Sequence, residues 1–139
     1  MESMTVATIS HRLRQGAVIV LACACLGPGD VSAETTAARA TSGDFDAEGP
    51  IDCVQRDGLP MGRCIARVAR APGGEATIVI TFENSFTRTL FFEDSAFLRA
   101  NTTMSGVGTD TDWRIEEGLH NIRVDDQRFV LPDVLIFGE

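Results

Sequence analysis

The densest alternation of apolar and polar residues lies in the middle of the chain. Between residues 76 and 82, Ala, Ile, Ile and Phe share one face of an extended segment, while Thr, Val and Thr share the other. This period of two in β-branched residues predicts a half-buried β-strand. Similar runs precede and follow it, and the Pro72–Gly74 turn signal separates the first two. The three runs cover residues 63–68, 76–82 and 88–92. Because short links join them, we expect the three strands to pair antiparallel.

The pattern continues to the end of the chain, with turn signals between short apolar runs. These runs cover residues 96–100, 113–116, 119–124, 128–131 and 134–137. Turns are predicted at Asp94-Ser95, Glu117-Gly118 and residues 125–127. Pro132 predicts an edge position or a bulge before the last run, because proline cannot donate to a ladder. No segment has convincing helical periodicity. The sequence therefore predicts an all-β fold, a small antiparallel meander that forms a sandwich or a barrel.

The first 33 residues have the three parts of a secretory signal peptide. Basic residues at positions 11–14 precede an apolar stretch at 17–26, and small residues at 31–33 form a cleavage site. The apolar stretch is shorter than the ~20 residues that span a bilayer. We therefore expect cleavage before Glu34 and a periplasmic or secreted protein. The alternative is lipidation of Cys25, which would anchor the protein to a membrane.

The chain that remains after cleavage of the signal peptide has two parts. Residues 34–50 are small, polar and interrupted by Gly and Pro, which predicts a flexible leader, and residues 51–139 form the β-rich domain. After cleavage only Cys53 and Cys64 remain, and an isolated pair in an oxidising compartment predicts a disulfide. Such a bond stabilises a small domain by roughly 2–3 kcal/mol. A redox or metal pair is the alternative, although ten intervening residues do not form a CxxC motif.

The charge of the chain limits its partners. From Glu34 onward there are eighteen acidic residues, ten arginines and no lysine, a net charge of −8. This balance argues against nucleic acid and against anionic membrane surfaces, because both are bound mainly through Lys and Arg. It permits basic partners, although acidic residues also serve solubility. The sequence sets no oligomeric state and indicates no cofactor.

Few residues offer catalytic or metal-binding chemistry. His120 is the only histidine after the signal peptide, and its alternation with Ile122 predicts a structural side chain, inward or half-buried, rather than a catalytic one. Asp110 and Asp112 would share one face of an extended segment, so they could bind Ca²⁺ or act as acid and base on a glycosidic bond. The EF-hand pattern fails there, because Arg114 occupies the fifth position of the loop. A solvated face is the favoured interpretation, and no metal is predicted.

Three residues are candidates for contact with a partner. Arg63 and Arg67 lie on one face of the same predicted strand, and arginine is enriched at interfaces because its planar fork pairs with carboxylates. The alternative is cross-strand pairing with acidic residues such as Glu83 or Glu93. Trp113, the single tryptophan, suits the core or an interface anchor.

Parts of the sequence resemble a family of small exported bacterial proteins of unknown function. Their pattern opens with a cysteine pair, here Cys53 and Cys64, and closes with a segment similar to IRVGDERYEIPDAVVFGG, here residues 122–138. The resemblance covers residues 45–139. The departures from the pattern are Asp125 for Gly, Phe129 for Tyr and Glu139 for the last Gly. The resemblance implies export and a single β-rich domain, and it transfers no catalytic residue.

These observations favour a non-catalytic binding or accessory module of the cell envelope. Its partner would be another envelope protein or an envelope polymer, and an acidic domain of this kind could inhibit a cationic hydrolase such as a lysozyme. The alternative is a small hydrolase or a calcium-binding domain that uses the Asp110/Asp112 region. A purely structural accessory domain is a third hypothesis.

Overall fold

The computed structural model describes residues 34–102 and 109–139 of the 139-residue chain. The predicted signal peptide lies outside the described residues, and so does Cys25. In the described part, neither helix has the length and apolar character needed to cross a membrane.

The described residues form eight β-strands and two short α-helices. The strands are β1 (Ala47–Val54), β2 (Gly62–Ala71), β3 (Glu75–Thr81), β4 (Thr87–Glu93), β5 (Ala96–Ala100), β6 (Thr111–Glu116), β7 (Leu119–Val124) and β8 (Gln127–Pro132). The helices are α1 (Thr36–Ser42) and α2 (Asp133–Phe137).

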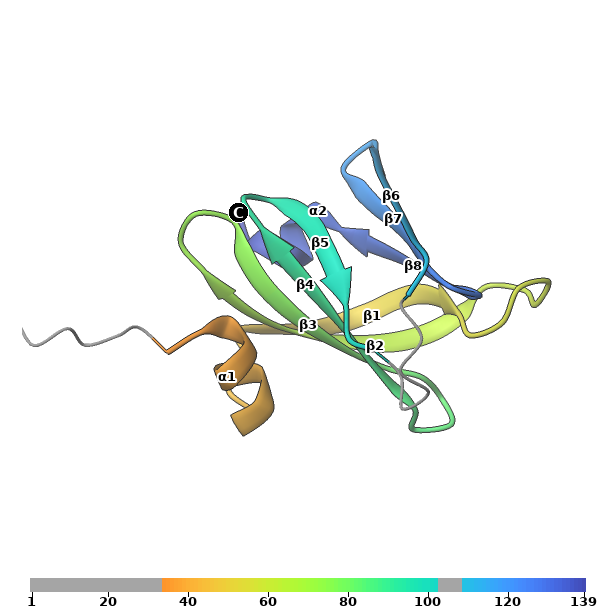
Figure 1. The fold of residues 1–139 in the computed structure, drawn as a ribbon, viewed down its shortest axis with the longest axis horizontal. Coiled ribbons are helices and arrows are strands. Elements are labelled where there is room, and N and C mark those ends of the chain that lie inside the picture. Colours follow the sequence, from red (N-terminus) through yellow and green to blue (C-terminus); the bar gives the residue numbers. More distant parts are fainter. Residues whose placement is uncertain (1–33, 103–108) are drawn as a thin grey trace, which may run out of the picture. The chain divides into compact units, whose positions relative to one another are not determined.

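All eight strands belong to one antiparallel sheet with the order β5-β4-β3-β2-β1-β8-β7-β6. Each strand therefore neighbours the next one in the sequence except at β5 and β6, which form the two edges of the sheet, and β8 returns to pair with β1. The sheet curls until its two edge strands, β5 and β6, approach each other, so it is nearly closed into a barrel (Figure 1). The prediction of an all-β antiparallel meander is confirmed, and the architecture is that of a barrel rather than a sandwich.

The predicted turns join the strands where the sequence places them. Both central residues have positive φ at Asp94-Ser95 (50° and 64°) and at Glu117-Gly118 (51° and 76°). This backbone twist matches the right-handed twist of the flanking strands, which is why such two-residue turns favour hairpins. Strands β4 and β5 and strands β6 and β7 therefore form tight hairpins.

Alternate residues of the strands point into the barrel and, except along β6, fill it together with Ile136 of α2. The largest fully buried apolar side chains are Phe92, Phe129, Ile51, Ile78, Ile80, Leu90, Ile122, Leu131 and Ile136. The inward row also holds three polar side chains, Arg88, His120 and Gln127. The barrel is thus a packed core, as expected for an eight-stranded barrel of this size.

Residues 34–50, which we expected to form a flexible leader, contain regular secondary structure. Residues 36–42 form α1, and residues 47–50 belong to β1. The Thr35 side chain caps α1 by accepting a hydrogen bond from the Ala38 N–H at 3.1 Å, and Gly43 ends the helix with a left-handed φ of 81°. Composition alone missed the helix because it is too short to show a hydrophobic period.

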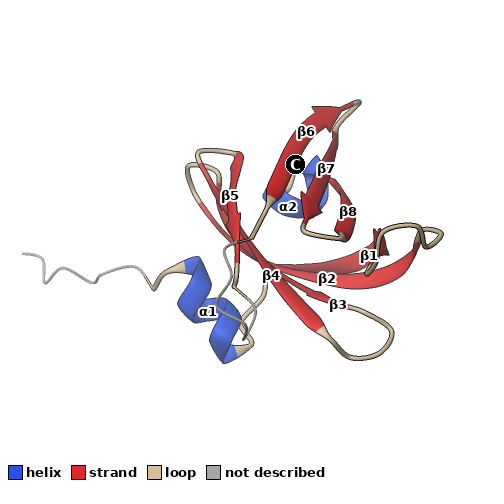
Figure 2. Cartoon of the chain, turned by 45° about the vertical axis from the view of Figure 1, so that its right-hand side comes forward, coloured by secondary structure: helices blue, strands red, loops and turns tan. Residues whose placement is uncertain are grey.

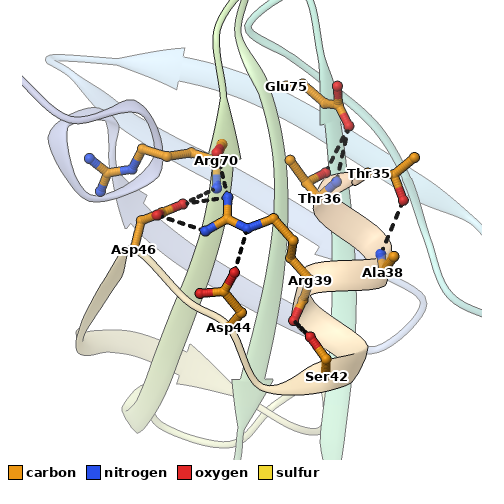
Figure 3. Close-up of polar contacts among 9 residues, drawn as sticks. All are labelled: Thr35, Thr36, Ala38, Arg39, Ser42, Asp44, Asp46, Arg70 and Glu75. Atoms are coloured by element: carbon orange, nitrogen blue, oxygen red, sulfur yellow. Dashed lines mark hydrogen bonds and ion pairs between the residues drawn. The ribbon is translucent and has the colours of Figure 1, made fainter. Parts of the chain in front are cut away.

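Polar side chains attach α1 to the outer face of β2 and β3 (Figure 3). The Arg39 guanidinium donates to both carboxylate oxygens of Asp46 at 2.8 and 3.0 Å, to Asp44 at 2.8 Å and to the Arg70 carbonyl at 3.0 Å. These hydrogen bonds from Arg39, followed by one from the Arg70 N–H, lower the pKa of Asp46. At the other end of the helix, the Thr36 hydroxyl donates to Glu75 at 2.9 Å. We call this set of contacts the α1 latch.

The strand expected over residues 134–137 is wrong, because residues 133–137 form the helix α2. Pro132 ends β8 with φ −62° and ψ 136°, and the chain turns into the helix directly after it. Asp133 lies in the first turn, where a carboxylate interacts favourably with the helix dipole. Four consecutive apolar residues fit a buried strand as well as one turn of helix, so periodicity could not separate the two.

Candidate functional site

The barrel has one interruption, the place where β5 and β6 face each other without a ladder in the described part of the chain. In both ribbon views the two strands diverge toward the Asp94-Ser95 and Glu117-Gly118 turns (Figures 1 and 2). We call residues 93–100 and 111–118 the seam. Such an interruption leaves backbone donors and acceptors on two strand edges, where another chain can pair with them.

Strand β6 is the most exposed strand at the seam. Its side chains are all exposed except that of Trp113, which is half-buried. Ile115 lies opposite the buried His120, so it points to the core side of the sheet, yet half of its surface (50 %) is exposed. An apolar side chain on the core side without cover marks an incomplete part of the barrel.

The hydrogen bonding of β6 identifies which of its backbone groups have no partner strand among the described residues. The Asp125 N–H donates to the Asp110 carbonyl at 2.7 Å, next to the start of the β6–β7 ladder. In an antiparallel pair, residues alternate between those that bond the partner strand and those that point away. Residues 112, 114 and 116 therefore bond β7. The N–H and C=O groups of Thr111, Trp113 and Ile115 point away from β7, to the edge where the described part of the chain forms no ladder.

An aromatic cluster lies behind the seam. The Phe92 ring packs edge-on against the rings of Phe97, His120 and Phe137, with centroids 5.5–5.8 Å apart. Trp113 stacks on His120 at 6.1 Å. Such arrangements are favoured by the charge distribution of aromatic rings. The cluster fixes the position of Trp113 on the inner side of β6.

His120 links this cluster to α2 through two hydrogen bonds. The Trp113 indole Nε1–H donates to His120 Nδ1 at 3.1 Å, and His120 Nε2 lies 2.7 Å from Asp133 Oδ1. An indole nitrogen is only a donor, so Nδ1 accepts and Nε2 carries the proton that is donated to Asp133. The imidazole is fully buried and both of its nitrogens are engaged. This geometry supports a structural histidine and leaves neither nitrogen available for proton transfer.

Charge at the seam is predominantly negative. Its carboxylates are those of Glu93, Asp94, Asp112, Glu116 and Glu117, and its cations are Arg99 and Arg114, a net charge of −3. Arg114 lies 3.7 Å from Glu116, and the Arg99 guanidinium stacks on the Phe91 ring at 4.0 Å. The seam therefore attracts positive charge.

Asp110 and Asp112 are not arranged as an acid–base pair or a calcium site. Arg123 donates to Asp110 at 3.1 Å, and this hydrogen bond raises the pKa of Arg123. Asp112 lies directly opposite Arg123 on the neighbouring strand. Among the described residues, no group of three or more His, Cys, Asp or Glu side chains could hold a metal ion. The arrangement is that of carboxylates neutralised by an arginine.

The three predicted contact residues do not form one site. Arg63 and Arg67 lie on the outer face of β2, whereas Trp113 lies on the inner side of β6, and three strands separate β2 from β6 in the sheet order. Arg63 lies 3.7 Å from Asp52 on β1, and the Arg67 guanidinium covers the Phe45 ring at 4.6 Å. Arg63 is therefore paired across strands with Asp52, and neither Glu83 nor Glu93, the acidic residues named as expected partners, takes part.

The predicted Cys53–Cys64 disulfide is confirmed. It joins β1 to β2 inside the barrel, where both cysteines are buried, and closes the exposed loop between the two strands. Leu59 and Met61 are exposed on that loop. The bond gives the loop a fixed base.

Arg88 is an inward-facing arginine that sequence reasoning overlooked. It donates to the Gln127 side chain and to the Asn101 carbonyl, both at 2.7 Å. Burial lowers the pKa of Arg88, because desolvation penalises its charge. The signal was present in the sequence, since Arg88 alternates with Leu90 and Phe92, the two residues of β4 that face the core.

No family model, curated protein or solved structure matches the chain. The resemblance to small exported bacterial proteins therefore stays a prediction, and the geometry alone carries the functional argument.

Proposed function

We propose that this protein is an exported, non-catalytic binding domain of the cell envelope, whose β6 edge receives an extended, basic segment of another protein. The observation that carries the proposal is the exposed β6 edge, where Ile115 is half uncovered on the core side of the sheet. The predicted signal peptide and the Cys53–Cys64 disulfide support export, because disulfides persist mainly in oxidising compartments.

Strand addition suits the backbone of β6. An incoming extended chain would pair with the outward N–H and C=O groups of Thr111, Trp113 and Ile115, which gives affinity through main-chain hydrogen bonds. Its alternate side chains would cover Ile115 and reach the aromatic cluster behind Trp113. This covering removes apolar surface from water at about 25 cal/mol per Å².

Charge selects the partner. A second copy of this chain would bring the same net charge of −3 to the seam, so like charges oppose pairing of two seams. A segment rich in Lys or Arg would instead meet Glu116, Glu117 and Asp94. The partner is therefore a basic protein, and a cationic hydrolase is the specific class that we favour.

Inhibition of such an enzyme has a direct assay. The chain from residue 34, which lies within the compact unit Ala33–Glu139, is added in large molar excess to a lysozyme acting on cell walls. A rate that falls with added domain supports inhibition. A rate that is unchanged by a large excess of the domain rejects lysozyme-type hydrolases as the partner. The pull-down described below tests binding to other basic proteins.

The alternative functions receive less support from the geometry. A hydrolase would need a free base, but His120 is fully engaged and Asp110 is paired with Arg123. A calcium site would need several oxygen ligands around one ion, and the described carboxylates do not gather in that way.

A pull-down from native envelope extract tests the proposal. The bait is the chain from residue 34, and the key variant is Ile115→Lys, which places a positive charge on the β6 edge. The matched control is Leu59→Lys, because Leu59 has a similar exposure (55 % against 50 %) but lies on the β1–β2 loop. We expect a basic partner that Ile115→Lys loses and Leu59→Lys retains. A partner that only Leu59→Lys loses would move the binding surface to the loop and reject the seam.

A further inference from the structure

A second surface lies on the outer face of β6, β7 and β8, and it shares Asp112 and Arg114 with the seam. A groove of about 400 Å³ runs between these strands and the β1–β2 loop. Its lining includes Met61, Arg114, Asn121, Arg123, Arg128 and Val130. Volumes of this order accommodate a ligand of a few residues. The groove is notable in an acidic protein because arginines dominate its charged lining.

The arginines are placed where they repel one another. Arg123 and Arg128 lie directly opposite each other on β7 and β8. Arg114 lies opposite Asn121, so it neighbours Arg123 diagonally on the same face. Like charges directly opposite each other destabilise a sheet. An anion between the guanidinium groups would remove this repulsion.

The neighbouring carboxylates neutralise these arginines only in part. Asp110 accepts from Arg123 at 3.1 Å, whereas Asp57 lies 3.5 Å from Arg128. Both members of the second pair are more than half exposed, and exposed pairs of this kind contribute little. Glu116 lies 3.7 Å from Arg114, and both members of this pair are likewise more than half exposed. Within the lining itself, three guanidinium groups face one carboxylate, that of Asp112.

Donor groups of the arginines remain available. Every hydrogen bond that Arg123 makes with other described residues comes from Nη1. Within the described part of the chain, Arg128 uses only Nη2, in its contact with Asp57. Since a guanidinium has five N–H donors in a fixed fork, each of these arginines retains a pair that fits a carboxylate.

We propose that this groove binds the carboxylate groups of an acidic peptide segment of a partner. The carboxylate would lie between Arg123 and Arg128, with Arg114 as a third donor. Met61 and Val130 give the peptide apolar contact, and Asn121 can pair with its backbone amide. This mixture of apolar, amide and guanidinium groups suits a peptide better than a free inorganic anion. The inference stands whether or not the seam binds a basic segment.

The test follows arginine side-chain Nε–Hε signals by NMR in the chain from residue 34. The probe is a blocked tetraglutamate peptide, with blocked tetraglutamine and inorganic phosphate as comparisons. We expect tetraglutamate to shift the signals of Arg114, Arg123 and Arg128 saturably, while Arg63 and Arg99 stay unchanged. Tetraglutamine is expected to shift none of them. Equal shifts at all five arginines would show non-specific attraction and overturn the proposal.

Variants separate the groove from general charge. The double variant Arg123→Gln/Arg128→Gln is expected to weaken tetraglutamate binding at least tenfold, whereas Arg99→Gln leaves it unchanged. Asp57→Asn removes a competing carboxylate, so it should tighten binding two- to fivefold, and it keeps the test valid even if the double variant folds poorly. Unchanged binding in Asp57→Asn together with tight phosphate binding would mean an inorganic anion site, which overturns the peptide proposal.

Discussion

The Cys53–Cys64 disulfide gives the sharpest prediction of stability. The bond closes a loop between residues separated by 11 positions. In the chain-entropy model, closing a loop of this length lowers the entropy of the unfolded chain enough to stabilise the fold by about 3 kcal/mol. Both cysteines are buried, so reduction leaves two thiols in the same apolar surroundings and changes the native packing little. The cost of reduction should therefore come mostly from the unfolded state.

The assay is guanidinium chloride unfolding of residues 34–139, with and without a thiol reductant. With a slope of about 3 kcal/mol per M, a loss of about 3 kcal/mol lowers the midpoint by about 1 M. The double variant Cys53→Ala/Cys64→Ala, which is indifferent to reductant, is the control. Equal midpoints for the oxidised and reduced chain would refute the reasoning, because the loop would then add no constraint beyond the β1–β2 ladder.

Four further substitutions test local parts of the structure. Arg39→Ala should release α1, so a protease should cut the chain before residue 46 faster. Because Arg39 lowers the pKa of Asp46 in the folded chain, the α1 latch should be fully formed above the ordinary pKa of 3.8. It should be lost as the pH falls below 3.8 and through the lowered pKa, which α1 NMR signals would report. Gly73→Ala should lower the free energy of unfolding, measured with urea, by about 1–2 kcal/mol, because alanine is strained at the positive φ of this position. Gly74→Ala should cost more, since its Cβ would also clash with the neighbouring β4–β5 turn. Asp133→Ala should cost about 1–3 kcal/mol by thermal or urea unfolding, because it removes the acceptor of a buried imidazole N–H.

Each of these changes has a result that would contradict it. Unchanged proteolysis in Arg39→Ala would mean that the Thr36 contacts hold α1 without the guanidinium. Equal costs for Gly73→Ala and Gly74→Ala would show that the turn relaxes around the added carbon. An unchanged free energy of unfolding in Asp133→Ala would mean that water, rather than the carboxylate, can serve as the partner of His120. An exposed aspartate of a turn, Asp126, gives the matched control for that change.

The strands could be predicted because their signals are local. Alternation and turn residues placed each of β2 to β8 within a few residues, and the positive-φ turns at Asp94-Ser95 and Glu117-Gly118 fall where the sequence indicates them. The two helices could not be predicted, because each has at most seven residues and depends on tertiary contacts. For α1 these are the hydrogen bonds from Arg39, and for α2 the hydrogen bond from Arg70 to the Leu135 carbonyl at 3.0 Å.

The candidate site was only partly accessible from the sequence. Trp113 could be singled out by its type, and the β6–β7 hairpin register brings it to the same face as His120. The seam could not be anticipated, because whether β5 pairs with β6 depends on the curvature of the whole sheet. The arginine groove was equally hidden, since Arg114, Arg123 and Arg128 meet only through the pairing of three strands.

The central claim, that the β6 edge receives an extended basic segment, is tested most directly by amide hydrogen exchange. The chain from residue 34 is measured alone and with a blocked hexapeptide of alternating Lys and Val. Pairing at the edge should slow exchange of the outward amides of Trp113 and Ile115 at least tenfold, while the Arg114 amide, which already bonds β7, changes little. Unchanged exchange at Trp113 and Ile115, or equal slowing by a peptide of alternating Glu and Val, would contradict the claim.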